Sequence, residues 1–182
     1  MLWIILGLIS LFLGVIIILY NQLVQSRQLV DNGWSDIEVQ LKRRADLIPK
    51  LVETVKAYAR HERNLFSEVI EKRHAALAAG DDPTARASAE NALQRPVGKI
   101  FALAEDYPDL KTSDNFLDLQ TELSETESKI EMARRFYNGA VRELNTKVES
   151  VPSNFVAKPF GFSKRDYFEI DEADYAVPEV NL

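Results

Sequence analysis

The first apolar segment of the chain is hydrophobic on every face, unlike any later segment. Residues Leu2 to Tyr20 contain no charged side chain and are mostly Leu, Ile, Val and Phe. At about 1.5 Å per helical residue they span roughly 28 Å, close to the thickness of a bilayer's hydrocarbon layer. Trp3 and Tyr20 stand at the two ends, where aromatic side chains favour the headgroup region. The pattern predicts a transmembrane anchor over residues 1–20.

The flanks of this segment argue against a cleaved signal peptide and suggest an orientation. No basic residue precedes the segment, and no small-x-small cleavage site follows it. Arg27 follows it closely. Because basic residues concentrate on the cytoplasmic side, we expect the N-terminus outside the cell membrane and the bulk of the chain in the cytoplasm.

Small residues share one face of the predicted anchor. Gly7, Ser10 and Gly14 are spaced by three and four positions. Such spacing lets two helices approach closely in lipid, so it predicts self-association through this face. The competing interpretation is that Gly and Ser are common in membrane helices.

After the anchor, apolar positions recur with helical spacing. The first soluble seam is Leu23, Val30, Trp34, Ile37 and Leu41. We expect a turn around Arg44 to Asp46, with Asp46 as N-cap and Pro49 in the first turn of a second helix that ends near Gly80. The alternative is one continuous helix kinked at Pro49.

Two more helices follow in the pattern. Asp82 and Pro83 read as the N-cap and first residue of a helix that stops before Pro108, and Pro96 leaves its continuity open. The last helix should run from Asp114 to about Glu149. Its apolar positions alternate steps of three and four: Phe116, Leu119, Leu123, Thr126, Ile130, Ala133, Tyr137, Ala140 and Leu144.

These elements predict an all-α fold in which one N-terminal transmembrane helix continues into an antiparallel up-and-down four-helix bundle over residues 21–150. Residues 151–182 are interrupted by prolines and rich in aromatic residues. We expect them to form a short extended segment packed on the bundle, with a solvated acidic end from Glu169 to Glu179. The packed aromatic residues would be Phe155, Phe160, Phe162, Tyr167 and Phe168.

Composition narrows the classes of function. The net charge of −6 argues against nucleic acid as the main partner, because phosphate backbones require clustered Lys and Arg. The chain has no cysteine, which excludes disulfides and thiolate chemistry.

Candidate catalytic and metal-binding patterns are weak. His61-Glu62 begins like a zinc-protease motif, but Leu65 stands where the second histidine is needed. Glu71 and His74 have the spacing of one half of a di-iron site, without a second copy. We therefore expect no catalytic residue, cofactor or metal.

The fourth predicted helix carries a charged strip. Glu127, Glu131, Arg134 and Arg135 are spaced for pairing one turn apart. The strip reads either as a solvated helix face or as a docking surface for a partner.

Several short stretches follow one another in a fixed order along the chain. The first are Asn21-Gln22-Leu23-Val24, Val30 to Ile37, Val39 to Arg44, Asp46 to Pro49 and Leu51 to Val55. Ala104 to Lys111, Arg134 to Asn138, Pro152 to Asn154 and Phe160 to Phe162 complete the series. In this order they closely resemble the LemA family. The resemblance assigns the following residues to family motifs: Asn21, Asp31, Asn32, Trp34, Asp36, Arg43, Asp46, Pro49, Tyr107, Pro108, Arg134, Arg135, Tyr137 and Asn138. Gly33 stands where alanine is more usual, and this should weaken the first helix slightly.

The resemblance implies a single-pass bacterial or archaeal membrane protein with no established enzymatic activity. We therefore expect a non-catalytic scaffold or adaptor that forms homo-oligomers and recruits other membrane proteins, such as a zinc protease. The alternatives are a regulatory subunit of a membrane protease, or a membrane-shaping or lipid-binding protein.

Overall fold

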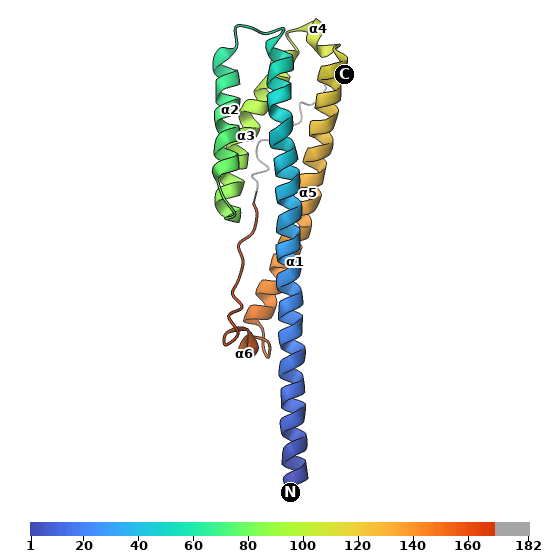
Figure 1. Ribbon diagram of the computed structural model, residues 1–182, viewed down its shortest axis with the longest axis vertical. Helices are drawn as coiled ribbons and strands as arrows, with labels where there is room; N and C mark the ends of the chain where they lie inside the picture. Colours follow the sequence, from blue (N-terminus) through green and yellow to red (C-terminus); the bar gives the residue numbers. More distant parts are fainter. Residues whose placement is uncertain (170–182) are drawn as a thin grey trace, which may run out of the picture. The chain divides into compact units, whose positions relative to one another are not determined.

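The computed structural model describes residues 1–169, which are helical over most of their length and contain no β-strand (Figure 1). The helices are α1 (Leu2–Lys56), α2 (Arg63–Ala78), α3 (Pro83–Ala104), α4 (Pro108–Lys111), α5 (Asp114–Glu149) and α6 (Asn154–Ala157). The prediction of an all-α fold with a long apolar N-terminal helix is confirmed, while the up-and-down bundle stays a prediction. Most of the acidic end from Glu169 to Glu179 lies outside the described residues.

The described residues divide into two compact units, each treated by itself. The N-terminal unit comprises residues 1–37 and 132–167, and the central unit comprises residues 38–131 together with Phe168 and Glu169. Helices α1 and α5 each contribute residues to both units. Helices α2, α3 and α4 belong wholly to the central unit.

The predicted turn at Arg44 to Asp46 is wrong, because α1 passes through it and ends only at Lys56. The apolar stripe continues across this region without a gap, and burying it favours a continuous helix over a turn. The buried stripe consists of Leu41, Ala45, Ile48, Leu51, Val52 and Val55. The chain instead turns at residues 57–62, which contain neither Gly nor Pro and so gave no turn signal.

Pro49 lies inside α1 and is accommodated by a side chain from α2. Proline has no N–H group, so the carbonyl four residues earlier, that of Ala45, loses its helical donor. The Nε–H group of Arg73 donates to this carbonyl oxygen. The Arg73 guanidinium also lies 3.8 Å from the carboxylate of Asp46. The helix therefore continues past a proline without leaving that carbonyl unsatisfied.

Helices α2 and α3 lie side by side and are joined by a short turn (Figure 1). Gly80 in this turn has a φ of 71°, a backbone conformation that glycine adopts without strain. The predicted cap is confirmed, because the Asp82 carboxylate accepts from the N–H of Ala85 at 2.7 Å. Helix α3 is continuous through Pro96, which settles the question that the sequence left open.

In the N-terminal unit, α1 and α5 approach closely at Gly33. A β-carbon built at Gly33 would lie 3.0 Å from Phe136 Cδ1 and 3.1 Å from Tyr137 Cα. The next residue, Trp34, packs its ring on that of Tyr137, with centroids 5.5 Å apart. The glycine that was expected only to weaken the helix thus permits this contact between helix backbones.

Gly33→Ala should therefore fail to give the stabilisation that alanine normally gives in a helix, about 1 kcal/mol over glycine. The new methyl group would press on the Tyr137 backbone, which cannot rotate away as a side chain can. Gly139→Ala is the matched control, because Gly139 is exposed on α5 and a β-carbon there would have nothing within 4 Å. Urea denaturation in mild detergent measures both variants. Equal stabilisation by the two changes would contradict the close contact.

The C-terminal part of the N-terminal unit runs back along α5. The side chain of Asn145 exchanges two hydrogen bonds of 2.9 Å with the backbone of Arg165, and Tyr137 donates to the carbonyl of Asp166 at 2.8 Å. The expectation that all five aromatic residues of this region pack is only partly correct. Phe162 and Phe168 are buried, and Phe160 is largely exposed but its ring contacts that of Tyr20. Phe155 and Tyr167 are exposed.

Candidate functional site

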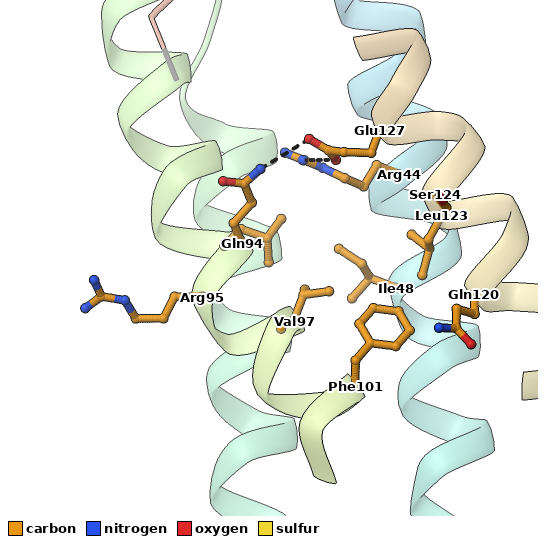
Figure 2. Close-up of a pocket in the computed structure, with 12 residues that line it drawn as sticks. Arg44, Ile48, Gln94, Arg95, Val97, Phe101, Gln120, Leu123, Ser124 and Glu127 are labelled. Atoms are coloured by element: carbon orange, nitrogen blue, oxygen red, sulfur yellow. Dashed lines mark hydrogen bonds and ion pairs between the residues drawn. The ribbon is translucent and has the colours of Figure 1, made fainter. Parts of the chain in front are cut away.

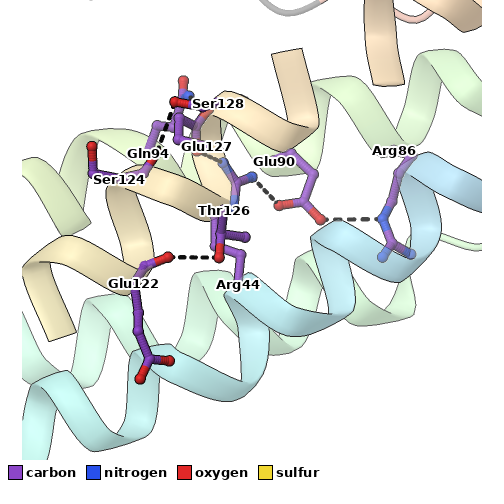
Figure 3. Close-up of polar contacts among 9 residues, drawn as sticks. All are labelled: Arg44, Arg86, Glu90, Gln94, Glu122, Ser124, Thr126, Glu127 and Ser128. Carbon is purple, nitrogen blue, oxygen red and sulfur yellow. Dashed lines mark hydrogen bonds and ion pairs between the residues drawn. The ribbon is translucent and has the colours of Figure 1, made fainter. Parts of the chain in front are cut away.

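The central unit holds a cluster of four charged side chains, which we call the ion cluster (Figure 3). Arg44, Arg86 and Glu90 are buried, and Glu127 is partly buried. Arg44 projects from α1, and its Nη1 donates to Glu127 Oε2 on α5 at 2.8 Å. Its Nη2 donates to Glu90 Oε2 on α3. One guanidinium therefore joins three helices.

Glu90 is shared between two arginines. Its second oxygen, Oε1, accepts from Nε of Arg86 at 3.2 Å, one turn earlier on α3. Arg44, Arg86 and Glu90 are all buried, so each charge has left water and depends on its partners. The four charges balance, as burial requires.

Electrostatics keep the central arginine charged. Burial by itself would lower the pKa of Arg44, but the carboxylates of Glu127 and Glu90 outweigh burial and raise the pKa above its ordinary value. Arg44 is therefore a fixed positive charge and does not act as a proton donor or acceptor.

A pocket of about 480 Å³ adjoins the ion cluster. Figure 2 shows Ile48, Val97, Phe101 and Leu123 directed into it from three helices, while Arg95 points away. Arg44 and Glu127 form its polar end together with Gln94, whose Nε2 donates to Glu127 Oε1 at 3.2 Å. The pocket thus has an apolar body and one charged, hydrogen-bonded end.

The groups that line this pocket are suited to binding. An apolar body with a few fixed polar groups can hold and orient a partner group. Ser124 is the hydroxyl in the lining, and no histidine lies among the lining residues to activate it. His61 and His74 are both outside the lining. Within residues 1–169, no three His, Cys, Asp or Glu side chains gather as they would to hold a metal ion.

The residues of the predicted anchor are exposed along the helix. Leu2 and Trp3 are among the most exposed apolar side chains, and a β-carbon added at Gly7 or Gly14 would have nothing within 4 Å. Ser10 is exposed as well. By length and composition, the apolar stretch of α1 could cross a membrane. Tyr20, at its end, contacts the rings of Phe160 and Phe162.

The residues assigned to family motifs do not form one site. Trp34 packs on Tyr137, Asp31 lies 3.4 Å from Arg165, and Asp46 faces Arg73. The exposed members of the set are Asn21, Asn32, Asp36, Arg43, Pro108 and Arg135. The partly buried members are Pro49, Tyr107, Arg134 and Asn138. The set is distributed over both units.

The sequence reasoning missed the ion cluster. The sequence pattern predicts Arg44 in a turn, and it predicts Glu127 in a charged strip that is either a solvated face or a docking surface. In the structure the Glu127 carboxylate accepts from Arg44 and Gln94. A signal was present: Glu90 lies three, seven and ten residues before Leu93, Val97 and Ile100, so it belongs to the apolar stripe of α3. A carboxylate on such a stripe indicates a buried partner of opposite charge.

Comparison with known proteins identifies one matching family and several similar proteins. The LemA family model matches residues 33–182. Magnetosome protein MamQ 2 of Paramagnetospirillum magneticum is 24% identical over 183 residues, which cover 87% of this chain and 67% of the relative. Magnetosome protein MamQ of Magnetospirillum gryphiswaldense is 23% identical and covers 86% and 67%. Protein LemA of Metamycoplasma hominis is 26% identical over 154 residues and covers 85% and 70%. None of these names gives a catalytic activity.

Proposed function

This chain belongs to the LemA family, and from that premise we propose that it is a single-pass membrane protein that acts as a non-catalytic scaffold. It would work by self-association and by recruiting membrane partners to its helical surface. The observation that carries the proposal is the apolar stretch at the start of α1, which is exposed and continues without a break into the folded part. Exposed apolar surface of this extent is stable in lipid and costly in water.

Continuity between anchor and fold supports a scaffold. Helix α1 has no flexible linker after Tyr20, and α5 is fixed to it six residues later. There, Lys147 Nζ donates to Ser26 Oγ at 2.7 Å and to Glu143 at 2.6 Å. The hydrogen bond and the charge of Lys147 lower the pKa of Glu143, so this contact is ionised at neutral pH. Partners in the same membrane would therefore meet a pre-ordered surface at raised effective concentration.

The proposed orientation of the chain in the membrane follows from the basic residue beside the apolar stretch. Arg27 is the basic residue nearest the apolar stretch on its C-terminal side. The N-terminus would lie outside and the helical part in the cytoplasm of a bacterial cell. The names of the MamQ relatives place those proteins with magnetosomes. For this chain, that likeness supports a role at a membrane.

Crosslinking between anchors tests self-association. The chain has no natural cysteine, so Ser10→Cys in the full-length protein introduces a single thiol on the small-residue face. Phe12→Cys is the matched control, because position 12 lies on the opposite side of the helix. We expect oxidation in native membranes to give a disulfide dimer from Ser10→Cys and little from Phe12→Cys. Adding Gly7→Leu and Gly14→Leu should abolish the dimer.

The outcomes of this experiment, and of a second one on the unmodified protein, decide between the proposed functions. Equal crosslinking of the two variants, or none from either, would refute assembly through this face. Chemical crosslinking of the unmodified protein in membranes then tests recruitment: a membrane protease as the dominant product would favour a regulatory subunit of that protease over a general scaffold. Recovery of the uncleaved chain in the soluble fraction would refute the membrane-anchored function as a whole.

A further inference from the structure

The loop that carries α6 presents two different faces. We call residues 151–162 the α6 loop. Val156, Ala157 and Phe162 are buried and hold the loop in place. Val151, Phe155 and Phe160 face outward, with 71%, 72% and 55% of their surfaces exposed. We call these three side chains the patch. Exposed apolar surface of this kind on one short loop is costly in water and typical of a binding surface.

Ring contacts place this loop at the end of the anchor. The ring of Phe160 lies 5.1 Å from that of Tyr20 and the ring of Phe162 lies 5.7 Å from it, both edge-on. The guanidinium of Arg27 lies over the Phe162 ring at 5.1 Å from its centroid. In Figure 1 the α6 loop lies beside α1 where the apolar stretch ends. All of these residues belong to the N-terminal unit.

Hydrogen bonds at the end of α5 hold the α6 loop close to the end of the anchor. Ser153 Oγ donates to the carbonyl of Lys147 at 2.6 Å, and Lys147 is itself bound to Ser26 on α1. Ser26 lies six residues beyond Tyr20, roughly 9 Å along the helix. The loop is therefore attached to α1 within about two turns of the bilayer boundary.

We propose that Val151, Phe155 and Phe160 insert into the headgroup region of the bilayer that holds the anchor. This inference rests on the membrane-anchored function proposed above. The apolar surface of the anchor continues through Tyr20 to Phe160, so this part of the α6 loop adjoins the bilayer. Aromatic side chains favour this interfacial depth. The loop gives the protein a second membrane contact, which restricts rotation and tilt of the anchor.

A basic residue of the α6 loop is consistent with a lipid surface. Lys158 lies between Phe155 and Phe160 in sequence and is exposed. Its ammonium can reach lipid phosphates while its apolar neighbours insert more deeply. A soluble protein partner would have to cover the same side chains where the bilayer already lies, so lipid is the occupant that the position favours.

Fluorescence quenching by lipid tests the proposal on the full-length protein. Phe155→Cys and Phe160→Cys each provide one thiol for an environment-sensitive fluorophore, since the chain has no other cysteine. The labelled proteins are reconstituted in phosphatidylcholine–phosphatidylglycerol vesicles that contain lipids spin-labelled near the headgroup. Phe136→Cys is the matched control: Phe136 is 49% exposed, and it lies 13 residues before the end of α5, roughly 20 Å along the helix.

We expect quenching at positions 155 and 160 to exceed that at 136 by at least about twofold, with blue-shifted emission at the first two positions. Circular dichroism confirms the fold of each variant, and all three substitutions replace exposed side chains. Equal quenching at the three positions, in protein that resists extraction from membranes by carbonate, would overturn this inference and leave the anchor intact. Extraction of the protein by carbonate would instead overturn the anchor itself.

Discussion

Replacing Glu90 by leucine is expected to lower the free energy of unfolding by about 3–5 kcal/mol, among the largest effects of any single change in the central unit. Glu90 accepts from both Arg44 and Arg86, and all three side chains are buried. Without the carboxylate, Arg86 loses this ion pair and Arg44 keeps only Glu127. A buried charge without its counter-charge carries a desolvation cost that packing does not offset.

Urea denaturation of the full-length protein in mild detergent, followed by circular dichroism, measures this effect. Glu127→Leu is the control, because it removes the other carboxylate from the same arginine. The side chain of Glu127 is 30% exposed, against 3% for Glu90. Its loss should therefore cost only about 1 kcal/mol. Equal losses from the two variants would show that burial does not set the strength of these contacts.

A second test separates the need for charge from the need for packing. The triple variant Arg44→Met, Arg86→Leu and Glu90→Leu removes the buried charges together. It should recover most of the stability that Glu90→Leu loses, because buried ion networks often exchange for apolar groups at little cost. A triple variant as unstable as Glu90→Leu would mean that the cluster contributes through shape alone.

Tyr137→Ala is expected to cost about 3–5 kcal/mol in the N-terminal unit, the range for removing a large buried aromatic side chain. Tyr137 is among the largest fully buried residues, and it contacts Trp34 from α1. Its hydroxyl also donates to the carbonyl of Asp166 and so connects α5 to the returning C-terminal segment. The substitution removes a ring contact, a hydrogen bond and the side-chain volume between two helices.

Tyr137→Phe isolates the hydroxyl from the ring. It keeps the contact with Trp34 and should cost only about 1 kcal/mol, the usual net value of one hydrogen bond. Thermal unfolding by circular dichroism, with tryptophan emission as a second probe, compares the two variants. A loss for Tyr137→Phe as large as that for Tyr137→Ala would place the stabilisation in the hydrogen bond to Asp166 rather than in packing.

The sequence predicted the elements whose signals are local. Helix α5 has the expected bounds because its apolar positions recur without interruption and nothing in it breaks a helix. The cap at Asp82 was also readable, since the N-cap residue and the proline that follows act within one turn. The apolar stretch of α1 was evident from composition alone.

Other features were missed because their causes lie far away in the sequence. The chain turns at residues 57–62, which contain neither glycine nor proline. Helix α1, by contrast, continues through a proline, Pro49. Local propensity thus favoured the wrong turn, and tertiary burial of the stripe on α1 overrode it. The ion cluster joins residues 46 and 83 positions apart, so no single segment could reveal which charges pair.

The arrangement at Pro49 fixes how α2 is aligned with α1. A regular helix offers no vacant carbonyl along its length, so a neighbouring arginine could shift by a turn without losing a specific acceptor. Here the proline leaves one oxygen vacant, at Ala45, and Arg73 occupies it. Sliding α2 by a single turn, about 5.4 Å, would carry the guanidinium past that oxygen. Pro49, a residue type usually regarded as a helix breaker, therefore favours one axial register of α2 against α1.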